Sequence, residues 1–232
     1  MEKYTVQCGK NALPYYSHGD RPQLLFIAGI HGDEFEITSL LAETISAYLS
    51  ALPSFFFIPE VSPSAQKLKT RCNCDGVDVN RNFFDNSTTE EVCAVMSLIK
   101  NQKFQTCISF HEDPFQEHFY LYDTENLHGT RMLNRLHDEL AELGVQLLNG
   151  IDDPHDPILG HEFADGYKWI IPQKNMSENG TLERWALCKG ITKRVCIPEI
   201  PGKVDVELKK RIIEAVFKHL IVPFATKSLQ IL

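Results

Sequence analysis

The chain has 232 residues, with 23 Lys and Arg against 31 Asp and Glu, so its formal net charge is −8 at neutral pH. Hydrophobic residues make up 43% and charged residues 23%, which is ordinary for a globular protein and excludes a low-complexity or collagen-like chain. The acidic balance argues against nucleic-acid binding, because neutralising phosphates requires an excess of Lys and Arg. A chain of this length can bury one substantial core, and we expect a single domain over residues 1–232.

The sequence also bears on location. No stretch reaches the roughly 18 apolar residues of a membrane span, and the first residues, Met1 to Gln7, lack the apolar segment of a signal peptide. We therefore expect a cytoplasmic protein with no membrane association. The seven cysteines show no regular framework, which agrees with a reducing compartment. The sequence leaves the oligomeric state open.

Short apolar runs alternate with helical patterns along the chain. Runs rich in aromatic or β-branched residues predict strands at 23–30, 55–58, 106–110, 119–122 and 194–197. Apolar residues at helical spacing predict helices at 37–48, 92–99, 133–143 and 208–220. This alternation favours an α/β fold with a mixed, mostly parallel central sheet flanked by helices. Ligands of such sheets bind at the carboxyl ends of the strands, so polar residues at those ends are candidates for a functional site.

Polar residues follow two of the predicted strands. His31 and Glu34 come directly after the first buried run, where a turn into a helix can aim an imidazole and a carboxylate at one point. His111 follows the strand at 106–110. Two imidazoles and one carboxylate are the ligands of a class of catalytic zinc sites that leave a fourth position for water. His31, Glu34 and His111 are therefore candidate ligands of one zinc ion per chain.

A third predicted strand is followed by Glu199, which lies between Pro198 and Pro201. A carboxylate among apolar residues and prolines is costly unless it is paired or protonated. One interpretation is a Glu that caps neighbouring backbone or pairs with a Lys. The other is a general base whose pKa is raised toward neutrality and which takes a proton from a water molecule.

The loop at residues 69–83 carries further candidates. Arg71 supplies a fixed positive charge that can stabilise a developing oxyanion. Asn80 and Arg81 offer an amide next to a guanidinium fork, which suits capture of a substrate carboxylate. For any single arginine of this loop, a solvated position with routine salt bridges is the more common arrangement.

The order of these elements resembles the zinc carboxypeptidase family typified by carboxypeptidase A, and the compact bacterial branch of it in particular. The shared elements are His31-Gly32-Asp33-Glu34, Arg71, the string Gly76-Val77-Asp78-Val79-Asn80-Arg81-Asn82-Phe83, His111 and Glu199. The resemblance implies a phosphorylase/hydrolase-like α/β fold. It also implies zinc on His31, Glu34 and His111. It further implies Arg71 at the oxyanion, Asn80 and Arg81 on the terminal carboxylate, and Glu199 as base and proton shuttle.

The family also places a tyrosine on a mobile loop between the third ligand and the catalytic Glu. Tyr120, Tyr122 and Tyr167 fall in that interval here. Tyr167, between Gly166 and Lys168, is the best placed of them and is our candidate for substrate contact.

Three functions fit this pattern. The first is a zinc metallocarboxypeptidase that hydrolyses the C-terminal amide bond of peptides. The second is a deacylase of small N-acyl amino acids, because aspartoacylase and succinylglutamate desuccinylase have a similar motif order. Those enzymes usually carry an additional β-rich C-terminal domain, whereas only 33 residues follow Glu199 here, which favours the peptidase. The third is a zinc- or carboxylate-binding module without turnover, whose expected signature is loss of the general base, and Glu199 is present.

Overall fold

The computed structural model describes residues 1–153, 160–173 and 176–224. Its strands are β1 (Glu2–Cys8), β2 (Asn11–His18), β3 (Leu24–Ile27), β4 (Phe55–Ile58), β5 (Phe104–Ser109), β6 (His111–Asp113), β7 (Tyr120–Asp123), β8 (Gly150–Ile151), β9 (Glu162–Phe163), β10 (Tyr167–Trp169) and β11 (Thr192–Pro201). Its α-helices are α1 (Glu36–Ala47), α2 (Pro63–Leu68), α3 (Glu90–Ile99), α4 (Arg131–Glu142), α5 (Leu182–Cys188) and α6 (Val206–Val216).

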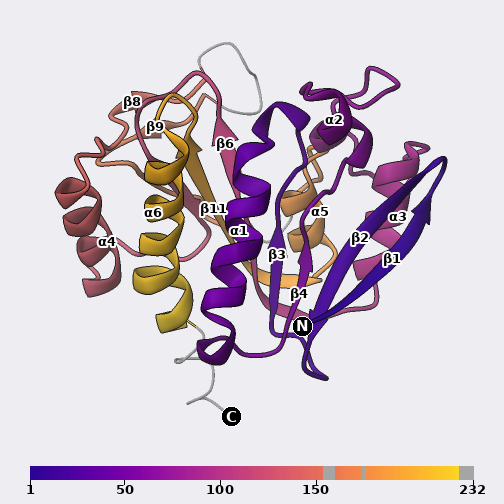
Figure 1. Ribbon diagram of the computed structural model, residues 1–232, viewed down its shortest axis with the longest axis horizontal. Coiled ribbons are helices and arrows are strands. Elements are labelled where there is room, and N and C mark those ends of the chain that lie inside the picture. The colour runs from indigo at the N-terminus through magenta and orange to yellow at the C-terminus, as the bar shows by residue number, and fades with distance from the viewer. Residues whose placement is uncertain (154–159, 174–175, 225–232) are drawn as a thin grey trace.

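A nine-stranded sheet crosses the centre of the described chain (Figure 1). The strands follow the order β1-β2-β4-β3-β5-β11-β7-β10, and β6 pairs with β11 beyond the end of β5. β4, β3, β5 and β11 run parallel to one another, β7 is antiparallel to β11, and the β1-β2 hairpin joins β4 antiparallel. The mixed, mostly parallel sheet confirms the predicted fold class.

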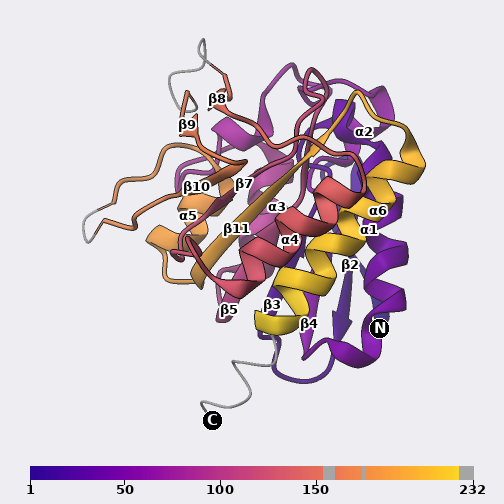
Figure 2. The same cartoon turned by 90° about the vertical axis from the view of Figure 1, so that its left-hand side faces the viewer.

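Helices cover both faces of the sheet, with α1, α4 and α6 on one side and α3 and α5 on the other (Figure 2). The side chains of the buried strand β3 explain why both faces of the sheet need a layer of helices. Leu24 and Phe26 pack into the cluster that includes α1 and α6, whereas Leu25 and Ile27 pack into the cluster that includes α3 and α5. Successive side chains of a strand point to opposite faces, so a run without polar residues fits a strand buried on both sides.

The structure contains every strand and helix predicted from the sequence; β4 has the predicted ends, and the others are shifted at one end or both. The predicted elements do not include the β1-β2 hairpin, the short helices α2 and α5, or the short strands β6, β8, β9 and β10. Most residues of β1 are exposed, so this strand carries no apolar run that would reveal it. Within the described part of the chain, no helix combines the length and the apolar character needed to cross a membrane.

Candidate metal centre

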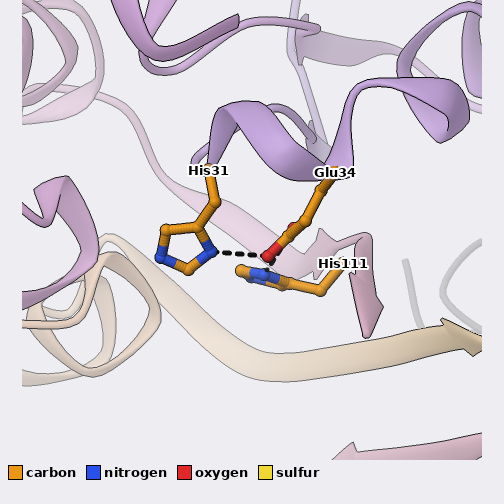
Figure 3. A group of neighbouring side chains, drawn as sticks. All are labelled: His31, Glu34 and His111. Atoms are coloured by element: carbon orange, nitrogen blue, oxygen red, sulfur yellow. Dashed lines mark hydrogen bonds and ion pairs between the residues drawn. The ribbon is translucent and has the colours of Figure 1, made fainter. Parts of the chain in front are cut away.

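His31, Glu34 and His111 point toward one another at the carboxyl edge of the sheet (Figure 3). Oε1 of Glu34 lies 2.5 Å from Nδ1 of His31, and its Oε2 lies 3.1 Å from Nδ1 of His111. One ligand atom from each residue can be chosen so that all three lie within 4.8 Å of one another. All three residues are buried, with exposed fractions of 3–6%. The structure therefore brings together the three residues that the sequence proposed as metal ligands.

The turn that presents two of these ligands depends on a glycine. His31 precedes a single 3-10 turn at Gly32–Glu34 (η1), directly after the end of β3. A Cβ atom on Gly32 would lie 1.9 Å from the carbonyl oxygen of Ala65, in α2, so no larger residue fits without moving backbone. The Gly32 N–H donates to the carbonyl of Thr70 at 2.9 Å. This close contact fixes the loop and thereby the direction of His31 and Glu34.

Each imidazole also contacts a second carboxylate through Nε2, the ring nitrogen that faces away from Glu34. Nε2 of His31 lies 3.2 Å from Oδ1 of Asp78, and Nε2 of His111 lies 3.3 Å from Oε1 of Glu183. An imidazole whose Nε2–H donates to a carboxylate keeps the lone pair of Nδ1 free, and carboxylates commonly orient metal-binding histidines in this way. Both Nδ1 atoms face Glu34. This set of two nitrogen donors and one carboxylate fits a zinc ion.

The charges at the centre favour a cation. Burial alone would raise the pKa of the Glu34 carboxyl, but the charges of His31 and His111 and their hydrogen bonds outweigh it and hold that pKa well below its usual range. Burial alone would lower the pKa of His111, yet the Glu34 and Glu183 carboxylates raise it. The site thus keeps Glu34 ionised and draws positive charge to its side. A divalent cation bound by the two imidazoles and Glu34 would supply that charge in place of the imidazole protons.

A cavity of about 530 Å³ opens in front of these ligands. Its lining contains seven of the eight residues proposed from the sequence, namely His31, Glu34, Arg71, Asn80, Arg81, His111 and Glu199. These residues come from the ends of β3 and β11, from β6 and from the loop after α2, which are far apart in the sequence. The rule that ligands bind at the carboxyl ends of strands therefore located the cavity correctly.

Glu199 lies beside the centre on β11. It is paired in register with His111 on β6 and with Tyr120 on β7. Paired residues on adjacent strands point to the same face, so the Glu199 and His111 side chains are neighbours. Burial and the neighbouring carboxylates Glu34 and Asp113 raise the pKa of Glu199 well above its ordinary value, although the positive charge of His111 opposes them. This carboxyl therefore holds a proton more readily than an exposed glutamate does.

The three candidates from the loop, Arg71, Asn80 and Arg81, form hydrogen bonds with different partners. Nε and Nη2 of Arg71 both lie 3.0 Å from Oδ2 of Asp78, and 44% of the Arg71 side chain is exposed. Nη1 of Arg81 donates to the carbonyl of Asn80 at 2.9 Å. Oδ1 of Asn80 accepts from the backbone N–H of Leu182 at 2.9 Å. Nδ2 of Asn80 donates to Glu183 at 3.4 Å, and an amide nitrogen has a second N–H that can serve a ligand.

The expectation for Tyr167 has to be corrected. Only 3% of this residue is exposed, and it is absent from the lining of the cavity. Its hydroxyl donates to the carbonyl of Glu125 at 2.6 Å and accepts from the N–H of Leu127 at 3.0 Å, so it anchors the turn after β7. Tyr120 and Tyr122 are the tyrosines that line the cavity, and their hydroxyls donate to Asp113 and Asp152.

Three residues that contact the candidate metal ligands are not among the site residues predicted from the sequence. Asp78 belongs to the family string but is given no role from the sequence, and Ser109 is only one residue of the predicted strand at 106–110. Glu183 was not noted at all, because α5 was not predicted. A signal for α5 does exist, since Thr181 is a helix-capping residue followed by apolar residues at helical spacing, Leu182, Trp185 and Ala186.

Comparisons with known proteins agree with this architecture. Neither protein-family models nor curated protein sequences gave a match. Among solved structures, a candidate metallopeptidase from Shewanella denitrificans matches with a TM-score of 0.73 and 21% identity, over 97% of this chain and 84% of that one. A metallo-carboxypeptidase from Pseudomonas aeruginosa, in complex with (2-guanidinoethylmercapto)succinic acid, matches with a TM-score of 0.65 and 18% identity, over 95% and 63% of the two chains.

A succinylglutamate desuccinylase from Silicibacter has a TM-score of 0.58 and 13% identity, over 92% of this chain and 61% of its own. At these identities the likeness is one of fold. The chain has the α/β fold of metallo-carboxypeptidases and of their desuccinylase relative, as the motif order of the sequence predicted.

Proposed function

We propose that this protein is a zinc-dependent metallocarboxypeptidase that hydrolyses the C-terminal amide bond of peptides. The observation that carries the proposal is the convergence of His31, Glu34 and His111 beside Glu199 in one cavity. A metal-binding set next to a carboxyl of raised pKa is the arrangement that water-activating hydrolases need.

Zinc would be held by His31, Glu34 and His111 and, when bound, would lower the pKa of a coordinated water from 15.7 to about 7. The chain's own residues supply the rest. Glu199 takes the proton of the attacking water and delivers it to the departing amine. Arg71 lines the cavity, and its guanidinium stabilises the negative charge that develops on the carbonyl oxygen.

We assign the free terminal carboxylate of the substrate to Arg81 and to the remaining N–H of the Asn80 amide. A guanidinium binds a carboxylate through two parallel hydrogen bonds, which also fixes the register of the peptide. Arg81 and Asn80 line the same cavity as Glu199, so one substrate can contact all three residues.

The experiment that tests the proposal offers the purified protein three sets of compounds. These are peptides with free C-termini, the same peptides with amidated C-termini, and N-acyl amino acids. Each is assayed with zinc and with a chelator. We expect release of the C-terminal amino acid from free peptides only, loss of activity with the chelator and recovery with zinc. Zinc binding without turnover of any compound would contradict the proposal and favour a binding module.

Deacylation of small N-acyl amino acids is the second candidate, and the fold shared with the desuccinylase supports it. It uses the same metal, the same base and the same carboxylate contact, so it differs only in the acyl side of the substrate. Turnover of N-acyl amino acids with none of the peptides would replace the first candidate with the second.

A further inference from the structure

We infer that Glu183 is a positioning residue of the metal centre, which holds His111 by its Nε2 so that Nδ1 faces the ion. The inference rests on the proposed metal-dependent function, but it concerns a residue outside the ligand set and outside the motif string. It assigns the short helix α5 a part in building the centre.

The contacts of the Glu183 carboxylate support this role. Its Oε1 accepts a hydrogen bond from the Ser109 hydroxyl at 2.6 Å and lies 3.3 Å from Nε2 of His111. The Ser109 oxygen is itself 3.2 Å from that nitrogen, so carboxylate, hydroxyl and imidazole form a closed triangle. Oε2 accepts from the Asn80 amide at 3.4 Å. Both oxygens of Glu183 are therefore engaged by residues of the site.

The backbone around Glu183 is fixed as well. The side chain of Thr181 caps α5, and the Leu182 N–H donates to Oδ1 of Asn80 at 2.9 Å. Just before the helix, Gly180 forms a bridge with Phe83, and a Cβ atom on Gly180 would lie 2.4 Å from the carbonyl oxygen of Arg81. The first turn of α5 therefore sits against the loop that carries Asn80 and Arg81.

Burial and charge indicate why a carboxylate is there. Only 5% of Glu183 is exposed, and a buried charge is costly unless it is paired. Among the described residues, His111 is the only basic group with which Glu183 forms an ion pair. The Ser109 hydroxyl and Nε2 of His111 supply the hydrogen-bond partners that this buried carboxylate needs. If the position only had to pack α5, an apolar side chain would serve without this cost.

His31 offers an internal comparison. Its Nε2 faces Asp78 while its Nδ1 faces Glu34, which is the arrangement that Glu183 creates at His111. The two carboxylates come from unrelated parts of the chain, a loop and a helix. Each leaves the Nδ1 atom of its histidine pointing at the same carboxylate.

The test compares metal binding by the wild type, Glu183→Gln and a matched control, Glu178→Gln. The control removes a carboxylate that pairs with Lys189 near the other end of α5 and forms no ion pair with a histidine in the described part of the chain. Zinc and cobalt are titrated against a competing chelating indicator, and the visible spectrum of the cobalt form is recorded. We expect Glu183→Gln to weaken both metals by about 10- to 100-fold. We also expect an altered cobalt spectrum, with the control unchanged.

A third variant, Ser109→Ala, keeps the test decisive if Glu183→Gln does not fold. It removes the hydroxyl that holds both Glu183 and His111, and we expect weakening by about 2- to 10-fold, the equivalent of one hydrogen bond. A folded Glu183→Gln variant with wild-type affinity and spectrum would overturn the inference, because a merely structural role lowers thermal stability alone. If the wild type binds neither metal, the proposed function itself fails.

Discussion

Oδ1 of Asp78 lies 3.2 Å from Nε2 of His31, the imidazole nitrogen that faces away from Glu34. Oδ2, the other carboxylate oxygen of Asp78, accepts a hydrogen bond from Nε of Arg71. Burial alone would raise the pKa of Asp78, but the hydrogen bond and charge of His31 and the charge of Arg71 outweigh it and lower that pKa to about 2. One ionised carboxylate thus orients a metal ligand and the cation proposed for the oxyanion.

We expect Asp78→Asn to weaken the orientation of His31 as a metal ligand and of Arg71 at the oxyanion. An amide accepts a weaker hydrogen bond from His31, and its NH₂ group cannot accept from Arg71. We expect zinc affinity to fall by about 10- to 100-fold. At saturating zinc, we expect kcat to remain below wild type because Arg71 is no longer held. Equilibrium metal titration and steady-state kinetics on the variant measure the two effects.

The matched control is Asp75→Asn, an exposed carboxylate in the same loop. It should leave zinc affinity and kcat at wild-type values. Equal effects of the two substitutions would mean that the charge of the loop matters and not the contact with His31.

Arg81→Ala tests the carboxylate contact. We expect kcat/KM for peptides with free C-termini to fall by the equivalent of about 2–5 kcal/mol, the cost of removing one partner of a charge pair. Any slow hydrolysis of the amidated peptides should be unchanged, because they carry no charge for Arg81 to bind. The control is Arg135→Ala, an exposed arginine on α4. Equal losses on free and amidated peptides would remove Arg81 from substrate recognition.

The metal ligands could be predicted because they follow strands whose apolar runs are unmistakable. Leu24 to Ile27 are fully or almost fully buried, so β3 carries no polar residue until the chain reaches the edge of the sheet. His31 and His111 are the first ionisable residues beyond β3 and β5. In a parallel sheet those ends lie together, so their position in the sequence predicts their position in space.

Glu183 and Tyr167 show what such patterns do not contain. Glu183 reaches His111 across 72 positions of sequence, and no local spacing encodes that contact. Tyr167 is the candidate from the sequence because it falls between His111 and Glu199 and is flanked by Gly166 and Lys168. It is instead the first residue of β10, and this pairing turns its ring into the core. In both cases the position of the side chain is set by contacts between segments that lie far apart in the sequence.

A buried ion cluster behind the centre yields a prediction about stability. Nζ of Lys209, on α6, lies 2.9 Å from Oε1 of Glu112 and 2.5 Å from Oε2 of Glu36, and only 2% of the lysine is exposed. Lys209→Ala leaves the buried Glu112 carboxylate without its cation. We expect the free energy of unfolding to fall by about 3–5 kcal/mol, measured by urea denaturation.

Lys210, the next residue, provides the control. It pairs with Glu43 at 3.2 Å on the surface, where 61% of the Glu43 side chain is exposed. Exposed ion pairs contribute little, so Lys210→Ala should leave the denaturation midpoint almost unchanged. A small effect of Lys209→Ala, similar to that of the control, would show that water or rearrangement satisfies Glu112.

The role of Glu199 as general base predicts the effect of Glu199→Gln. Glutamine keeps the shape of the side chain but cannot accept a proton, so kcat should fall by about 10²- to 10⁴-fold. Zinc content should stay at the wild-type value, because Glu199 is not among the ligands. Loss of zinc would make Glu199 a ligand, and retained kcat would assign the proton transfer to another group.

The raised pKa of Glu199 predicts the sign of a pH effect. Burial and the Glu34 and Asp113 carboxylates hold the pKa of the native carboxyl well above the value of about 4.5 expected in the unfolded chain. At pH values between the unfolded and the native pKa of Glu199, the native state therefore binds more protons than the unfolded state. The contribution of Glu199 to stability is then most favourable below that unfolded value and declines as pH rises through the native pKa.

Glu199→Gln carries no such proton, so the metal-free variant should exceed the metal-free wild type in unfolding free energy by an amount that grows with pH and levels off above the native pKa. Zinc adds positive charge beside the carboxylate, which lowers its pKa and should shrink this difference. Denaturation of both proteins across pH, with and without zinc, measures the effect. A difference that is constant with pH, or that zinc enlarges, would contradict the raised pKa and with it the tuning of Glu199 as the base.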